Sequence, residues 1–317
     1  MRKKGRVLVT GARGFLGSAC VRALTDQGWE VIGTCSPGHS PKSAQSDDGV
    51  EWHQVDLLDS GQSRALLRRV KPSYLLHAAW LAVRGNIWHS ADNLSWLTAS
   101  IDLVRAFHET GGQRVAAIGS SGEYDWSEGI CRNGVTPLRP DTLYGSCKHA
   151  LQVALSGYAD SADLGFVWPR VFFTYGPGEY ETRLVASVIR SLVRGEPAET
   201  TNGEQSRDYL HIDDVARGIV AALDSRWQGP IDIVGGEAIK VRQLVSEVAR
   251  QMGREDLLRI GAIPSAATVA PLVQGDIAQA RDALGWSPRF SVAEGIADTI
   301  AWGRNAFAQE SSIGDRP

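Results

Sequence analysis

The stretch Arg6-Val-Leu-Val-Thr-Gly-Ala-Arg-Gly-Phe-Leu-Gly17 decides the fold of this 317-residue chain. Residues 6–10 form a short apolar run that is typical of a buried β-strand, and glycines follow it at three-residue intervals. Apolar residues then recur at helical spacing from 18 to 27, and Gly28 is a suitable helix end. Glycine allows a sharp turn and a close approach to a pyrophosphate, which the N-terminus of the following helix attracts. The stretch therefore predicts the strand, turn and helix of a dinucleotide-binding domain.

Beyond this turn, strand and helix patterns alternate along the chain. The expected strands are 30–34, 50–55, 74–78, 114–118 and 165–168, and the expected helices between them are 62–70, 93–110 and 144–159. Helices that connect successive strands in this way predict the α/β class, with a doubly wound parallel (Rossmann) sheet and helices on both faces.

The pattern changes after Phe173. A helical pattern at 183–194 is followed by a stretch at 208–224 with a strand-like start and a helix after Asp213, and then by a strand at 230–234. The rest mixes short helices with Pro and Gly breaks, which predicts a smaller mixed α/β substrate lobe. We expect residues 1–168 plus about 206–234 to form the dinucleotide-binding domain. Residues 169–205 plus 235–317 are expected to form the substrate-binding lobe.

Composition narrows the class of partner. A formal net charge of −3 gives no general attraction to nucleic acid or to anionic membranes. The four cysteines lack C-x-x-C spacing, so neither a metal ribbon nor a disulfide framework is indicated. No apolar run is long enough to span a bilayer. We therefore expect a cytoplasmic protein with no metal, no nucleic-acid partner and no membrane partner.

A second pattern carries acid–base chemistry. Tyr144-Gly-Ser-Cys-Lys148 places a phenol and an ammonium four residues apart, on one face of the expected helix. A phenol has an ordinary pKa of about 10. A nearby ammonium favours the phenolate and should lower that pKa. Tyr144 and Lys148 therefore form a candidate general acid/base pair.

The glycine spacing T-G-x-x-G-F-x-G of Thr10 to Gly17 resembles the extended short-chain dehydrogenase/reductase family, which includes sugar-nucleotide epimerases, dehydratases and reductases. The resemblance continues to Trp302 through four further motifs, among them the tail motif from Asp276 to Trp286. It implies a homodimer and a set of cofactor-binding residues. These are Gly11, Arg13, Gly14, Phe15, Leu16, Gly17, Ser36, Asp56, Leu57, Ala78, Ala79, Tyr144 and Lys148. For Asp56, a helix N-cap is the alternative.

The end of the second expected strand bears on the choice of cofactor. Enzymes that use NAD usually carry Asp or Glu there for the ribose 2′-hydroxyl, whereas this chain has Thr34-Cys35-Ser36. Arg13 in the turn, with His39 and Lys42 in the next loop, suits a 2′-phosphate. The sequence therefore favours NADP(H), and NAD(H) bound through backbone contacts stays open.

The resemblance also assigns a catalytic hydroxyl. In the family it lies four residues before a Tyr in S-S-x-x-Y, which corresponds to Ser120, with Ser121 as the second choice. The resemblance further gives Lys148 the nicotinamide ribose. Asn93 and His77 match family positions near the active site and the cofactor, but a structural role is at least as good an account of each.

Two motifs of the second half imply substrate contacts. Residues 169–177 resemble L-R-x-x-N-x-Y-G-P, with Phe173 in place of the Asn that contacts the sugar nucleotide in relatives. Arg207 matches the arginine of G-x-x-x-R-D-F-I-H-V-D-D, and a guanidinium suits a diphosphate. A salt bridge to Asp208 or Asp213 is its alternative. The expected substrate-binding residues are Ser121, Glu123, Phe173 and Arg207.

The residues after Ser120 narrow the reaction. The family's dehydratases carry Asp-Glu directly after the catalytic hydroxyl, whereas this chain has Ser121-Gly122, with Glu123 one position late. Dehydration is therefore disfavoured. The sequence favours reduction of a 4-keto sugar on a nucleotide diphosphate, with a NAD-dependent 4-epimerase as the alternative. A dinucleotide-binding sensor or scaffold without catalysis is a remote third hypothesis.

Overall fold

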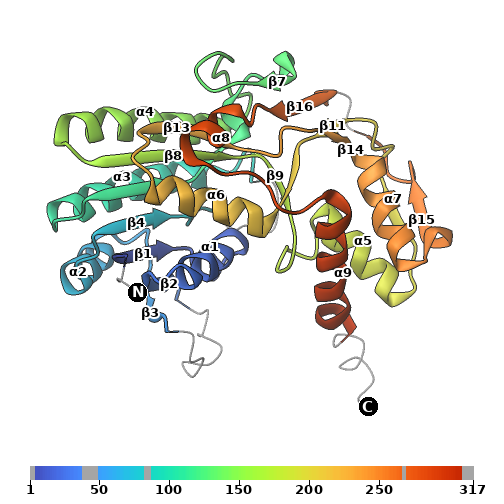
Figure 1. Ribbon diagram of the computed structural model, residues 1–317, viewed down its shortest axis with the longest axis horizontal. Helices are drawn as coiled ribbons and strands as arrows, with labels where there is room; N and C mark the ends of the chain where they lie inside the picture. Colours follow the sequence, from blue (N-terminus) through green and yellow to red (C-terminus); the bar gives the residue numbers. More distant parts are fainter. Residues whose placement is uncertain (1–3, 38–48, 82–86, 266–268, 309–317) are drawn as a thin grey trace.

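The computed structural model describes residues 4–37, 49–81, 87–265 and 269–308. The strands of its largest sheet are β1 (Arg6–Thr10), β2 (Glu30–Cys35), β3 (Glu51–Gln54), β4 (Tyr74–His77), β5 (Arg114–Ala117), β6 (Gly119–Ser120), β8 (Gly165–Val171) and β13 (Gly229–Ile233). Their order is β13-β8-β5-β4-β1-β2-β3, and β6 pairs with β8 (Figure 1). Every pairing between these strands is parallel, so the expected fold class is confirmed.

Helices cover both faces of this sheet (Figure 1). One layer contains α1 (Phe15–Asp26) and α6 (Ile212–Asp224), and the other contains α2 (Ser60–Val70), α3 (Asp92–Glu109) and α4 (Leu143–Ala162). Val9 of β1 belongs to the apolar core on the first face, and Leu8 belongs to the core on the second. This follows from the alternation of side chains along a strand. Because β1 lies between β2 and β4, its carboxyl end is the topological switch at which open α/β sheets bind ligands.

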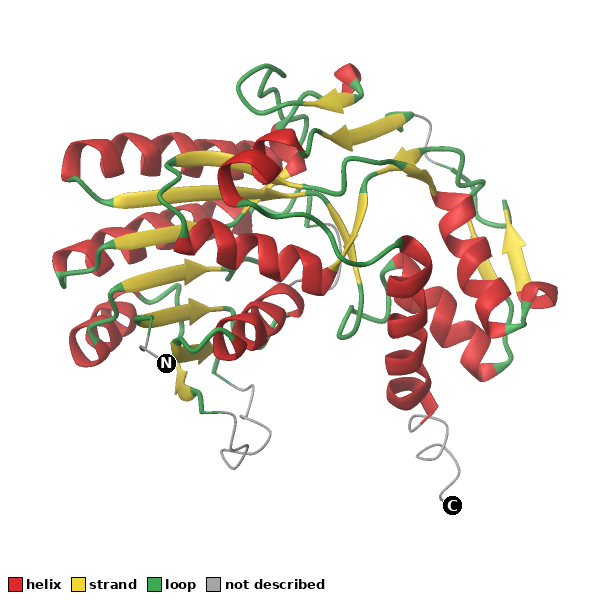
Figure 2. Cartoon of the chain, viewed as in Figure 1, coloured by secondary structure: helices red, strands yellow, loops and turns green. Residues whose placement is uncertain are grey.

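A smaller lobe of helices and short strands lies beside the sheet (Figure 2). Its helices are α5 (Leu184–Arg194), α7 (Val241–Met252) and α9 (Val292–Ala308), which pack around a separate apolar core. Its parallel strand pair is β10 (Ala198–Thr200) with β15 (Leu258–Ile260). The mixed α/β lobe expected after Phe173 is therefore present.

The remaining described elements are short strands, a short helix and 3₁₀ turns. They are β7 (Ile130–Cys131), β9 (Phe173–Tyr175), β11 (Ser206–Arg207), β12 (Tyr209–His211), β14 (Ile239–Lys240), β16 (Leu272–Gly275), α8 (Ala278–Leu284) and the 3₁₀ turns η1 (Ser121–Glu123), η2 (Trp126–Glu128) and η3 (Glu255–Leu257). The small sheets are β14-β11-β16-β7 and β12-β9.

Strand β8 is longer than expected. It continues past Pro169 to Val171, because β13 and β6 pair with it beyond the proline. The expected boundary after residue 168 therefore falls inside a strand.

Candidate active site

The glycine turn lies against the end of β4. Gly11 has a φ of +64°, and a Cβ there would lie 2.8 Å from the backbone of Ala79 and 3.1 Å from that of Ala78. At Gly17 a Cβ would lie 2.1 Å from the carbonyl oxygen of Gly11. Gly14 precedes the first helical residue of α1. The turn thus keeps the helix N-terminus free of side-chain atoms where a pyrophosphate would approach.

Phe15 and Leu16 form the first turn of α1 and are partly buried against the first core. Leu57 is buried in the second core. Asp56 is exposed, and its carboxylate accepts the Leu58 N–H at 3.0 Å. The N-cap of α2 is Asp59, so the alternative of Asp56 as that cap is wrong.

A cation lies at the open end of β1 and β2. The guanidinium carbon of Arg13 is 3.9 Å from the centroid of the Trp52 ring, and the ring covers Gly33 of β2. The Arg13 side chain is exposed, and within the described residues no carboxylate pairs with it. Ser36, directly after β2, is also exposed. The other two expected cofactor-loop residues, His39 and Lys42, lie outside the described residues.

A close backbone contact brings the catalytic candidates together. Helix α4 is capped by Thr142, whose hydroxyl accepts the Gly145 N–H at 3.1 Å. A Cβ at Gly145 would lie 2.1 Å from the carbonyl oxygen of Gly122. Glycine at 145 therefore lets the start of α4 touch the turn after Ser120. A Cβ placed on Gly122 would lie 3.5 Å from Ser120 Oγ and 3.8 Å from the Tyr144 ring.

The Tyr144 phenol is half-buried. Burial raises its pKa, and the Glu123 carboxylate adds to that shift, whereas a hydrogen bond with Ser120 and the charge of Arg183 oppose it. The expectation that Lys148 lowers the pKa of Tyr144 is therefore not met. Without a cofactor, this phenol stays protonated at neutral pH.

The position of Lys148 explains why it does not lower the pKa of Tyr144. Lys148 is 5% exposed, its Nζ donates to the Ile118 carbonyl at 2.9 Å, and Nζ lies 3.8 Å from the centroid of the Trp80 ring. Burial lowers its pKa to about 7, against an opposing effect of Glu123. The ammonium thus points toward a carbonyl and an indole face, and its charge is only partly maintained at neutral pH.

Tryptophans surround Tyr144, and the sequence did not point to them. The Trp88 ring meets the Tyr144 ring edge-on at 5.4 Å, and the Trp80 ring does so at 6.4 Å. Trp126 continues the row, 6.5 Å from Trp88. In the composition, only the total of ten tryptophans could have suggested an aromatic site. Trp126 lies far along the sequence from Trp80 and Trp88, so no local pattern joins the three.

Arg207 lies at the end of this aromatic row. It is 6% exposed, and its guanidinium carbon is 5.4 Å from the Phe173 centroid and 5.9 Å from that of Trp126. Nη1 donates to the carbonyls of Ser206 and Ala270, both at 2.8 Å. Arg207 is thus held rigidly beside two aromatic faces.

The salt bridges offered as an alternative for Arg207 do not occur. Asp208 accepts backbone N–H groups of Gly235, Gly236 and Gly275. Asp213 pairs with Arg22 at 2.9 Å. In the described part of the chain, no carboxylate pairs with Arg207.

A family model matches this arrangement of turn and catalytic candidates over residues 7–235 and is described as the NAD dependent epimerase/dehydratase family. The chain belongs to that family. The expected resemblance is confirmed.

Relatives in this family match almost the whole chain. A UDP-glucose 4-epimerase of Mycolicibacterium smegmatis is 29% identical over 95% of this chain and 99% of its own. A dTDP-4-dehydro-6-deoxy-D-allose reductase of a Streptomyces species is 25% identical over 94% and 96%. The solved structure of MoeE5 in complex with UDP-glucuronic acid and NAD is 30% identical, with a TM-score of 0.80 over 95% of this chain and all of that one. The relatives thus differ in the reaction they are named for.

Two family-matched residues have structural roles here. His77 Nδ1 lies 2.7 Å from Thr10 Oγ1, and Nε2 lies 2.9 Å from Ser100 Oγ. Burial lowers the pKa of His77 to about 3, so the imidazole is neutral. Both ring nitrogens are therefore used to join β1, β4 and α3.

Asn93 is fully buried, and its side chain joins the loop before α3 to Trp80. Its amide donates to the carbonyls of Ile87 and Ser90, both at 2.8 Å, and its oxygen accepts the Trp80 indole N–H at 2.8 Å. These bonds shape the wall of the site rather than face a ligand.

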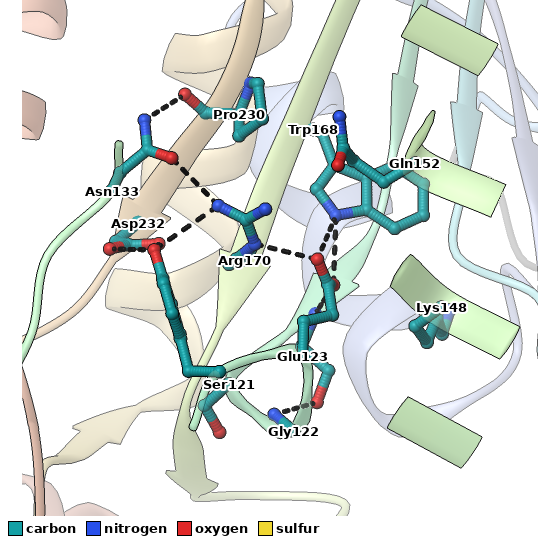
Figure 3. A network of polar contacts seen from close by, with 12 residues as sticks. Ser121, Gly122, Glu123, Asn133, Lys148, Gln152, Trp168, Arg170, Pro230 and Asp232 are labelled. Carbon is teal, nitrogen blue, oxygen red and sulfur yellow. Dashed lines mark hydrogen bonds and ion pairs between the residues drawn. The ribbon is translucent and has the colours of Figure 1, made fainter. Parts of the chain in front are cut away.

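The expectation that Glu123 contacts substrate is wrong. Glu123 is fully buried, and its carboxylate accepts the Ser120 N–H at 2.7 Å and Arg170 Nε at 2.7 Å (Figure 3). Trp168 Nε1 donates to both of its oxygens, at 3.0 and 3.1 Å. A carboxylate with all its contacts inside the protein has no free acceptor site for a sugar. Ser121 is also buried, directly beside Ser120.

One group of potential metal ligands occurs among the described residues. Side-chain atoms of His211, Asp213 and Asp298 lie within 4.8 Å of one another. Asp213 already pairs with Arg22, and His211 Nε2 lies 3.3 Å from Asp298.

In the same described part of the chain, no helix is both long and apolar enough to cross a bilayer.

Proposed function

We propose that the protein is an oxidoreductase that reduces the 4-keto group of a sugar carried on a nucleotide diphosphate, with NADPH as reductant. The observation that carries this proposal is that Ser120, Tyr144 and Lys148 lie together. Trp80, which contacts both Tyr144 and Lys148, directly follows Ala79, whose backbone packs on Gly11 of the glycine turn. A proton donor, a hydrogen-bonding hydroxyl and a cation next to a dinucleotide site suit carbonyl reduction.

Each residue has a distinct task in this proposal. The bound nicotinamide supplies a hydride. Ser120 holds the carbonyl oxygen of the substrate, and Tyr144 gives that oxygen a proton. The raised pKa of Tyr144 supports this direction of transfer, since the phenol is in its acid form before the reaction. Lys148 binds the nicotinamide ribose and supports the phenolate that remains.

Arg207 and its aromatic neighbours are the proposed nucleotide-diphosphate site. Nη1 is held by two carbonyls, which leaves the rest of the guanidinium fork for phosphate oxygens. Trp126 and Phe173 offer faces on which a base or sugar can pack. Ser121 is a proposed substrate contact beside Ser120. The names of the relatives support this class, because they specify UDP- and dTDP-sugars.

The preference for NADPH rests on Arg13. Its exposed guanidinium, stacked on Trp52 beside β2, is placed to meet a 2′-phosphate. Ser36 and Asp56 are the proposed ribose and adenine contacts. The second candidate function is a 4-epimerase with NAD, which the M. smegmatis relative and the NAD in MoeE5 favour.

The assembly is also proposed. Leu94 on α3 and Val153 on α4 are 52% and 56% exposed, and these two helices pack side by side. These two exposed apolar side chains support the homodimer through helices that the family resemblance implies. The same proposal includes a cytoplasmic location and the two-domain division, with the first boundary moved from residue 168 to the end of β8 at Val171.

The cofactor released from denatured, freshly purified protein separates the two functions. A reductase exchanges its cofactor, so we expect a largely empty site that binds NADPH more tightly than NADH. Stoichiometric NAD in the supernatant would instead establish the epimerase. Protein from which neither cofactor is released and to which neither binds would end both proposals.

A further inference from the structure

Four buried charged side chains form a row beneath the catalytic hydroxyl. Lys148, Glu123, Arg170 and Asp232 are 5%, 0%, 1% and 2% exposed. They come from α4, η1, β8 and β13, and their charges alternate in sign along the row (Figure 3). Buried charges destabilise a protein unless they are paired, so four buried charges at one site indicate a specific role for them.

The centre of the row is a two-sided clamp on Glu123. Arg170 Nε donates to the carboxylate at 2.7 Å from one side. On another side the carboxylate accepts the backbone N–H of Ser120 at 2.7 Å. Trp168 fixes both oxygens through its indole N–H. The carboxylate therefore sets the position of the residue that carries the catalytic hydroxyl.

Asp232, at the far end of the row, helps to hold Arg170 in place. Arg170 Nη1 donates to Asn133 Oδ1 at 2.9 Å and to Tyr124 Oη at 3.3 Å. Tyr124 Oη donates in turn to Asp232, whose two oxygens both lie at 2.9 Å. Burial raises the pKa of Asp232 to about 7, and Arg170 opposes that shift. Arg170 is thus anchored between two carboxylates.

Lys148, at the near end, lacks a direct carboxylate partner within the described residues. Its Nζ bonds the Ile118 carbonyl and lies 6.0 Å from the ring centroid of Trp168, the same indole that donates to Glu123. Glu123 is the acidic group whose charge opposes the effect of burial on Lys148, and the Trp168 indole lies near both side chains. His77 also acts on Lys148 but is neutral, and Tyr144 lies one turn away on α4.

We propose that Glu123 is a positioning residue, which fixes Ser120 through the Ser120 backbone N–H and, clamped by Arg170, supplies a counter-charge that favours the ammonium form of Lys148. The role of Glu123 in catalysis rests on the proposed function. Its effect on the pKa of Lys148 can be tested without any substrate. Burial alone drives Lys148 toward the neutral amine, and a neutral amine cannot support a phenolate at Tyr144.

The sign of the effect follows from the charges around each group. Glu123 raises the pKa of Lys148 and also that of Tyr144, which Arg183 and Ser120 lower. Removing the negative charge should therefore lower both pKa values. A nearby opposite charge typically shifts a pKa by about one unit or more. Lys148 in a Glu123→Gln variant should then lose its proton below neutral pH.

The test is a pH titration of the full chain labelled with ¹³C at the lysine ε-carbons. The Lys148 resonance is identified by its loss in Lys148→Met. In Glu123→Gln we expect the apparent pKa of Lys148 to fall by about one unit. An unchanged pKa would overturn the counter-charge. Asp232→Asn is the matched control at the far end of the row and should shift Lys148 much less; an equal shift would overturn the specific role of Glu123.

A second variant covers the case in which Arg170, left unpaired, prevents folding of Glu123→Gln. Glu123→Leu with Arg170→Met removes both charges together, which buried ion pairs often tolerate. The pKa of Lys148 should again fall, because Glu123 is the removed charge that acts on Lys148. An unchanged pKa of Lys148 would overturn the inference. Failure of the proposed function would show separately, as absence of turnover by the wild-type protein with an unaltered Lys148 titration.

Discussion

The nucleotide turn and the proposed substrate side of the site are built in opposite ways. The turn is one stretch, Gly11 to Gly17, in which backbone and missing Cβ atoms make the binding surface. The substrate side consists of Trp88, Trp126, Phe173 and Arg207, which come from distant segments and act through side chains. A single added methyl group should therefore abolish most dinucleotide binding by the turn. On the substrate side, each side-chain substitution should weaken substrate binding only in part.

Gly17→Ala is the change expected to have the largest effect. Its Cβ would lie 2.1 Å from the Gly11 carbonyl oxygen, so the turn must open. We expect dinucleotide affinity to fall by about 100-fold or more and the free energy of unfolding to fall by about 1–3 kcal/mol. Calorimetric titration and thermal unfolding measure the two. Gly157→Ala on α4, where a Cβ meets nothing within 4 Å, is the control and should be neutral or slightly stabilising. Unaltered binding by Gly17→Ala would show that the turn is not the cofactor site.

Tyr144→Phe tests the chemistry between the two regions. Loss of the phenol should reduce turnover by about 10²–10⁴-fold, while dinucleotide affinity stays nearly unchanged, since only the proton donor is removed. Steady-state rates and cofactor titration check this, with the 55% exposed Tyr180 changed to Phe as control. Activity like that of the wild type would remove Tyr144 from the mechanism and favour a protein that only binds the dinucleotide.

Arg207→Lys tests the side-chain-built region. A lysine keeps the charge but loses the fork, so we expect KM for a nucleotide-diphosphate sugar to rise by about tenfold with little change in kcat. Arg250→Lys is a matched control, because Arg250 is exposed and pairs with Glu247. If KM does not change, the diphosphate binds elsewhere.

Arg13→Ala should have the smallest effect. Only the 2′-phosphate contact is lost, so affinity for NADPH should fall by about tenfold, near 1.4 kcal/mol, with little loss for NADH. Arg22→Ala on the exposed face of α1 is the control. Equal losses for NADPH and NADH would mean that Arg13 does not read the phosphate.

The difference between the two regions also explains what could be predicted. The long elements carry their own periodicity, so helices α1 to α6 and the strands of the parallel sheet, except the two-residue β6, were expected close to where they lie. The strands β11 and β14, of two residues each, have no such signal, and they form because distant segments offer partners. For the same reason the end of β8 was misplaced at Trp168, before Pro169, whereas the strand continues to Val171.

Among the site residues, the outcome depended on contacts across the fold. Glu123 follows Ser120, the proposed catalytic serine, closely enough to suggest a contact with substrate, but the strand that carries Trp168 and Arg170 encloses it. The Y-x-x-x-K spacing correctly put Tyr144 and Lys148 on one helix face. It could not reveal that Lys148 faces a carbonyl and an indole.

The sequence by itself determined the family, the parallel sheet and the dinucleotide turn, because these depend on residues that are neighbours along the chain. Only the tertiary structure decided which charges are buried, which of them pair and which aromatic rings meet at Tyr144. Burial and pairing set the pKa values of Tyr144, Lys148 and Asp232, and both are properties of segments that the fold brings together from far apart.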